Sequence, residues 1–121
     1  APGALFHVGD GHAAQGDGEV CGIATEIPTR GTFTFDLIKE HVIGTPRIES
    51  DEFIMTIGSA RPMEDAARIA FHELILWLEQ DFGIDRTVGY QLCSQVARVR
   101  LANMVDVLYS VVAKFPKRYL P

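Results

Sequence analysis

The chain has few cysteines and few basic residues, and each shortage excludes a class of function. Its 121 residues include two cysteines, Cys21 and Cys93, and no Cys-x-x-Cys pair. A zinc ribbon and a thioredoxin-like redox site are therefore excluded. We expect two buried thiols, although a disulfide between them stays open. Lys and Arg total 11 against 16 Asp and Glu, for a net charge of −5. We expect no nucleic-acid partner, because phosphate binding needs a surplus of basic side chains on one face.

Long apolar runs are also missing. No run approaches the roughly 20 residues that cross a bilayer, and no signal peptide is recognisable. We therefore expect no membrane partner and a cytoplasmic location. The apolar content of 47% and the charged content of 22% are ordinary for a globular domain. The sequence begins without Met and enters an apolar run almost at once, so we expect a fragment or processed chain of a longer protein.

The period of the apolar pattern changes near residue 60. Before it, alternating and β-branched segments predict strands at residues 4–8, 20–27, 31–38 and 52–57. Apolar residues then recur every three or four positions over residues 63–82, which predicts an amphipathic helix. A second helix is expected over 86–96, and two more strands after it, at 98–103 and 109–113. This order predicts an α+β fold of mostly antiparallel β layers with two α-helices packed on them.

Residues 9–20, GDGHAAQGDGEV, combine four glycines with a dense set of polar side chains. One interpretation is a long β-hairpin loop with turns at its two Asp-Gly pairs. Another is a site for a divalent ion such as zinc. Asp10 and His12 lie two residues apart, so on an extended segment they point the same way, and Asp17 and Glu19 repeat that spacing. Spacing alone leaves both open. A phosphate loop, an EF-hand and a dinucleotide-binding fingerprint do not fit the sequence.

Residues 3–22, GALFHVGDGHAAQGDGEVCG, closely resemble the signature segment of the acetamidase/formamidase family. A looser similarity continues at residues 26–28, 53–58, 63–78, 90–106 and 116–117. The resemblance implies an acetamidase/formamidase-like fold and the hydrolysis of short-chain amides, such as formamide and acetamide, to a carboxylate and ammonia. Family proteins are longer, so it implies that residues 1–121 are a C-terminal segment. The N-terminal portion of the same protein, possibly as a separate chain, would complete the active site. Together with the apolar helix, the resemblance also suggests a homo-oligomer.

Five residues match the polar positions of the family signature: Asp10, His12, Gln15, Asp17 and Glu19. By their chemistry, Asp10 and His12 would hold a divalent metal together with ligands outside this chain, and the metal we expect is zinc. Glu19 would be the general base for the attacking water, Asp17 a second carboxylate, and Gln15 a catalytic amide that contacts the substrate. The alternative is a non-catalytic structural subunit or a small-amide-binding module of the same fold.

Three other residues allow two interpretations each. Trp77 lies off the main apolar stripe of its helix, so it is either a rim residue of an oligomer interface or partly buried. Arg100 either pairs with a carboxylate or faces water, and the second is the default. Cys21 is either a nucleophile or a thiol buried in a strand, and we expect burial.

Overall fold

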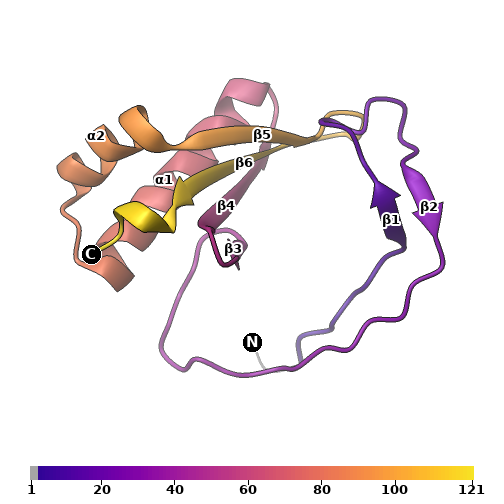
Figure 1. Cartoon of the computed structure of the whole chain (residues 1–121), viewed down its shortest axis with the longest axis horizontal. Helices are drawn as coiled ribbons and strands as arrows, with labels where there is room; N and C mark the ends of the chain where they lie inside the picture. The colour runs from indigo at the N-terminus through magenta and orange to yellow at the C-terminus, as the bar shows by residue number, and fades with distance from the viewer. Residues whose placement is uncertain (1–2) are drawn as a thin grey trace.

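The computed structural model describes residues 3–121 and has a helix-covered sheet on one side and an extended N-terminal segment on the other (Figure 1). The elements are β1 (Gly11–Ala14), β2 (Thr25–Ile27), β3 (Arg47–Glu49), β4 (Phe53–Ala60), α1 (Met63–Phe82), α2 (Arg86–Val96), β5 (Arg98–Asn103), β6 (Tyr109–Pro116) and the short 3₁₀ helix η1 (Lys117–Tyr119). The main sheet is antiparallel, with strand order β3-β4-β6-β5. Helix α1 packs on β4 and β6, and α2 packs on α1. A second, small antiparallel sheet consists of β1 and β2. The predicted α+β fold with two helices is confirmed.

Helix α1 begins and ends where the sequence predicts. Glu64 and Asp65 occupy its first turn, where the helix dipole favours negative charge. Gly83 ends the helix with φ of 65°, a left-handed conformation that glycine adopts without a steric penalty. The buried face of α1 packs against buried side chains of β4 and β6 and forms the core: Ile54, Ala70, Leu74, Leu78, Ala113 and Phe115. The amphipathic period of the sequence thus accounts for the position of the core.

Strand β4 approaches the backbone of α1 very closely at Gly58. A Cβ atom on Gly58 would lie 2.0 Å from the carbonyl oxygen of Ala66 and 2.7 Å from the backbone nitrogen of Ala70. Two residues earlier, the Thr56 hydroxyl donates a hydrogen bond of 2.6 Å to the Ala70 carbonyl. Glycine is therefore required at position 58, since any side chain would displace the helix from the sheet.

A buried ion pair ties β3 to α1. Arg47 donates to the carboxylate of Glu73 through Nε at 2.9 Å and through Nη2 at 2.7 Å. The second oxygen of Glu73 accepts a hydrogen bond from the backbone N–H of Gly44. The guanidinium also lies over the ring of Trp77, 5.1 Å from its centroid. Trp77 is only 6% exposed, so it belongs to the core of this chain, and burial is the one of its two interpretations that agrees with the structure.

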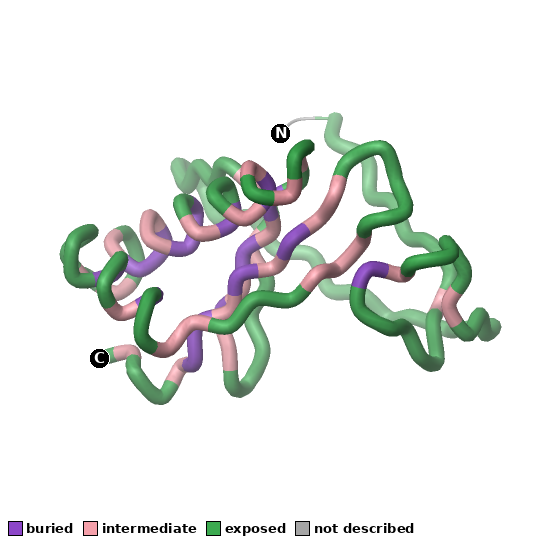
Figure 2. Tube along the Cα trace, turned by 90° about the horizontal axis from the view of Figure 1, so that it is seen from above, coloured by how far each residue is buried: buried purple, intermediate pink, exposed green. Residues whose placement is uncertain are grey.

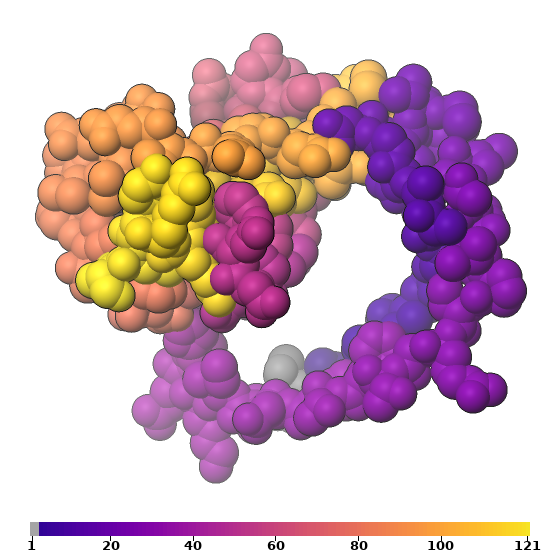
Figure 3. Space-filling model, in the orientation of Figure 1, coloured from indigo at the N-terminus to yellow at the C-terminus, as the bar shows by residue number. Residues whose placement is uncertain are grey.

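Residues 3–46, called the N-terminal arm below, run in a wide path that leaves an open space between the arm and the helix-covered sheet (Figure 3). Most of the arm is exposed (Figure 2). The strands predicted at 4–8 and 31–38 are absent, and the strand predicted at 20–27 is reduced to Thr25–Ile27. The apolar residues of these segments have no neighbouring strand to pair with. The aromatic rings of Phe6, Phe33 and Phe35 cluster instead, at centroid distances of 5.0 and 4.7 Å.

The two cysteines differ in environment. Cys93 is buried in the core, whereas Cys21 is exposed on the arm, and both thiols are free. The prediction that Cys21 is buried in a strand is therefore wrong for this chain, because the segment around it is not part of a sheet. Within residues 3–121, neither helix is long and apolar enough to cross a membrane.

Candidate functional site

The hairpin of β1 and β2 places a histidine opposite a glutamate. His12 on β1 pairs with Glu26 on β2 in the antiparallel register, and side chains of directly opposed residues lie on the same face of a sheet. A register shift follows His12, and Gly11 lets Thr29 approach the strand, since a Cβ there would lie 1.9 Å from a Thr29 methyl carbon. Gly11 is therefore the glycine that this hairpin requires, and the face with His12 and Glu26 is polar.

Three potential metal ligands meet on that face. The Nε2 atom of His12 lies 3.0 Å from the Oε2 atom of Glu26 and 3.5 Å from the Oδ2 atom of Asp10. One ligand atom from each of the three side chains lies within 4.8 Å of the others, the only such group of three found among residues 3–121. The predicted pairing of Asp10 with His12 is thus present, and Glu26 joins it.

The other ring nitrogen of His12 is held by Gln15. His12 Nδ1 and Gln15 Oε1 are 2.8 Å apart, and Gln15 Nε2 donates to the carbonyl of Ala102 on β5 at 3.1 Å. The amide of Gln15 therefore bridges the hairpin to the edge of the main sheet.

The side chains of Asp10, His12 and Glu26 shift one another's pKa values. The pKa of His12 is raised, first by the hydrogen bond with Gln15 and then by the negative charges of Glu26 and Asp10. The interaction between the two carboxyl groups raises the pKa of Glu26 and lowers the pKa of Asp10. Without a metal, Asp10 is the more readily ionised carboxyl group. A divalent cation at this point would neutralise the mutual repulsion of the two carboxylates.

Asp17 and Glu19 lie outside this group and contact β5 instead. Asp17 forms an exposed ion pair with Arg100, so Arg100 is both paired and exposed. Glu19 accepts a hydrogen bond of 3.3 Å from the side-chain amide of Asn103, and its φ of 45° is uncommon for a glutamate. Between them, buried Gly18 exchanges backbone hydrogen bonds with the edge of β5. The second half of the signature is thus fixed by the main sheet.

The three ligand side chains fit a zinc ion by number, type and spacing. Zinc binds imidazole nitrogen and carboxylate oxygen at about 2.0–2.2 Å, so neighbouring ligand atoms of a tetrahedral site are about 3.3–3.5 Å apart. The two distances from His12 Nε2, 3.0 and 3.5 Å, bracket that value. If these three side chains alone bound zinc, a fourth position would stay open, as in catalytic rather than structural zinc sites.

No role was predicted for Glu26 from the sequence. Residue 26 was expected in a strand at 20–27, outside the glycine-rich loop of residues 9–20. In the structure β1 forms inside the glycine-rich segment itself, at Gly11–Ala14. The available signal was a lone carboxylate in the otherwise uncharged residues 20–29, but its partner depends on the hairpin register.

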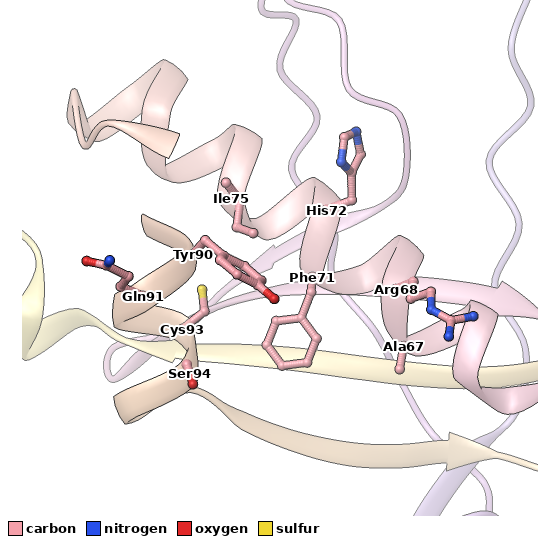
Figure 4. Close-up of a pocket in the computed structure, with 9 residues that line it drawn as sticks. All are labelled: Ala67, Arg68, Phe71, His72, Ile75, Tyr90, Gln91, Cys93 and Ser94. Carbon is pink, nitrogen blue, oxygen red and sulfur yellow. The ribbon is translucent and has the colours of Figure 1, made fainter. Parts of the chain in front are cut away.

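A pocket of about 670 Å³ lies between α1 and α2, away from the polar hairpin. Figure 4 shows Phe71, Ile75 and Tyr90 lining it, with Cys93 between the two helices. Burial raises the pKa of the Cys93 thiol to about 11, so this thiol is neutral at physiological pH and a poor nucleophile. None of the five polar signature residues lines this pocket.

Solved structures show the same fold. The acetamidase from Yersinia enterocolitica superimposes with a TM-score of 0.87 and is 52% identical over 91% of this chain and 33% of its own. An acetamidase from Bacillus halodurans gives a TM-score of 0.72 at 23% identity, covering 89% and 37% of the two chains. A predicted acetamidase/formamidase from Thermoanaerobacter tengcongensis gives 0.74 at 23% identity, covering 88% and 36%. The chain therefore spans about a third of the length of these proteins.

The family model agrees with the structural comparison. The chain belongs to the acetamidase/formamidase family, because the model of that family matches residues 1–118. No match was found among curated proteins. The family resemblance of the signature segment is thus confirmed over nearly the whole chain.

Proposed function

We propose that this chain supplies the metal-binding part of an amidohydrolase that converts short-chain amides, such as formamide and acetamide, to a carboxylate and ammonia. The single observation that carries the proposal is the convergence of Asp10 and His12, from the family's signature segment, with Glu26 on the opposite strand. A histidine between two carboxylates is suited to a divalent metal. The 52% identity to a protein described as an acetamidase supports the reaction class.

The reaction adds water across a resistant bond, so both the water and the carbonyl need activation. Asp10, His12 and Glu26 would hold a divalent metal, for which we propose zinc. When bound, the metal would supply the Lewis acidity that polarises the amide carbonyl. Glu19 accepts a proton from the attacking water as its oxygen bonds to the carbonyl carbon. The C–N bond then breaks, and the proton passes to the departing nitrogen, from Glu19 or through the second carboxylate, Asp17. The N-terminal portion of the protein completes the site.

Ammonia release tests this function. The isolated chain, and the chain mixed with the part of the Y. enterocolitica acetamidase that it does not match, are each incubated with formamide. We expect ammonia from the mixture alone. No ammonia from either sample would contradict the catalytic proposal. In that case, zinc binding would favour a small-amide-binding module. The absence of both zinc binding and turnover would favour a structural subunit. In an active mixture Glu19→Gln should abolish turnover, whereas Glu64→Gln, an exposed glutamate in α1, should not.

The exposed apolar residues of the arm support the proposal that the N-terminal portion of the protein binds this chain. Leu37, Ile38 and Val42 are 71%, 74% and 84% exposed, and large apolar side chains left this exposed favour contact with a partner. We propose that the N-terminal portion of the same protein covers the arm. Mixing the two portions should then protect the arm from limited proteolysis, whereas the helix-covered sheet should be resistant in both samples. An arm that is cleaved equally fast with and without the partner would contradict this.

We also propose a cytoplasmic homo-oligomer. The surface of the two helices exposes apolar side chains at Ile69, Val88 and Tyr90, which is suited to contact between copies. Two free cysteines are typical of a reducing compartment. Light scattering of this chain mixed with the N-terminal portion should give a mass above that of one copy of each, and Tyr90→Glu should lower that mass. A mass equal to one copy of each would contradict the oligomer.

A further inference from the structure

We propose that Gln15 is a positioning residue that sets which nitrogen of His12 faces the metal, and that the backbone carbonyl of Ala102 sets the orientation of Gln15. This inference rests on the metal site proposed above and assigns a role to residues around it. It also replaces the role expected for Gln15 from the sequence, a direct contact with the substrate, because both polar ends of its side chain are already engaged.

The donors and acceptors around Gln15 determine which way its amide faces. A backbone carbonyl is only an acceptor, so the atom of Gln15 that faces Ala102 at 3.1 Å has to be the nitrogen. The amide oxygen then faces His12 Nδ1 at 2.8 Å and is only an acceptor. Nδ1 must therefore carry a proton. In the neutral imidazole this leaves the lone pair on Nε2, the nitrogen that lies near Asp10 and Glu26.

An irregularity in β5 makes the Ala102 carbonyl available. The pairing of β5 with β6 shifts register between Leu101 and Asn103, so Ala102 has no partner residue on β6. A bulge of this kind leaves its extra residue unpaired and redirects the backbone. Strand β5 is also the edge of the main sheet. The free edge is then occupied by the signature loop.

The same edge fixes the loop that carries Gln15. The N–H of Gly18 donates to the Leu101 carbonyl at 2.8 Å, and the N–H of Met104 donates to the Gly18 carbonyl at 2.9 Å. Gly18 is required for this approach, since its φ is 82° and a Cβ would lie 3.0 Å from the Met104 side chain. The backbone contacts hold the loop in place independently of the Gln15 side chain. Replacement of Gln15 should thus leave the loop seated and alter only the contact with His12.

The proposal is tested by zinc affinity. The chain of 121 residues is titrated with zinc in competition with a chromophoric chelator, as the native protein and as three variants. Gln15→Met keeps the length of the side chain and removes both hydrogen bonds. Gln95→Met, on the exposed side of α2, is the matched control, and His12→Ala removes a ligand. We expect Gln15→Met to weaken zinc binding about 10- to 100-fold, the usual effect of losing a hydrogen-bond partner of a metal ligand, while Gln95→Met binds as the native chain does.

Ring-nitrogen NMR of the zinc-loaded chain provides the second readout, which a merely structural role of Gln15 would not move. We expect a protonated Nδ1 and an unprotonated Nε2 in His12 of the native chain. Zinc on Nδ1, or undiminished affinity in Gln15→Met, would overturn the role of Gln15 and leave the metal site standing. Native zinc affinity no higher than that of His12→Ala would overturn the metal site and this inference together.

Discussion

Replacing Arg47 with methionine should strongly destabilise the chain, because it leaves a buried carboxylate without its partner. The side chains of Arg47 and Glu73 are 7% and 5% exposed. After the replacement Glu73 loses both guanidinium hydrogen bonds and keeps only the N–H of Gly44 at 3.2 Å. Since Gly44 is near the end of the arm, the pair also fixes the point at which the arm joins the helix-covered sheet.

The expected magnitude follows from the contacts that remain. Removing one partner of a buried ion pair costs about 3–5 kcal/mol. The Nη1 atom of Arg47 is itself buried and has no hydrogen-bond partner among the described residues, so its removal recovers part of that cost. We therefore expect a loss of about 3 kcal/mol in the free energy of unfolding, at the lower end of that range. For a chain of 121 residues this corresponds to a decrease of about 12 °C in Tm.

Urea unfolding followed by circular dichroism measures this loss. Arg68→Met is the matched control, because Arg68 pairs with Asp65 on the surface and its side chain is 76% exposed. The control should change the free energy of unfolding by less than about 0.5 kcal/mol, as is usual for surface pairs. A loss below about 1 kcal/mol in Arg47→Met would refute the argument that this pair is buried and structurally necessary.

Three further predictions concern packing, protonation and thiol access. Gly58→Ala should lower the free energy of unfolding by about 3 kcal/mol in urea melts, since its Cβ overlaps the backbone of α1; a native-like melt would contradict that contact. Zinc affinity should rise with pH and continue to rise above 6.5, because the pKa of His12 is raised from that value and its proton competes with the metal; an affinity that is constant across this range would exclude His12 as a ligand. A thiol reagent should label Cys21 quickly and Cys93 only on unfolding, as mass spectrometry would show; equal labelling rates in the native chain would contradict the buried position of Cys93.

The helix-covered sheet could be predicted from the sequence because its signals are local. The apolar period over residues 63–82 identifies α1, the Asp85 cap marks the start of α2 by accepting hydrogen bonds from Thr87 and Val88, and the strands of the core contain buried apolar residues. Each of these signals operates within one turn of helix or a few residues of strand.

The arm could not be predicted in the same way. Its Thr–Phe alternation over residues 31–38 is typical of a strand, but a strand forms only where another strand is available for pairing, and the described residues offer none there. The position of Trp77 stayed open at the sequence level for a related reason. Its helical position lies off the apolar stripe, yet Arg47 from β3 covers its ring, and the sequence does not show which element packs on which.

Two of the three candidate metal ligands followed from spacing, and the third did not. Asp10 and His12 were expected on one face because two-residue spacing on extended backbone guarantees it. Glu26 joins them through the register of a hairpin whose turn is long, and turn length rather than composition sets register. The roles expected for Asp17 and Glu19 remain predictions.

The central claim is that Asp10, His12 and Glu26 together hold one divalent metal. It is tested most directly by anomalous X-ray scattering at the zinc edge from crystals of the protein grown with zinc. The account predicts one peak per chain, about 2.0–2.2 Å from His12 Nε2 and from an oxygen of each carboxylate. Crystals that contain zinc elsewhere, or none at these three side chains, would contradict it.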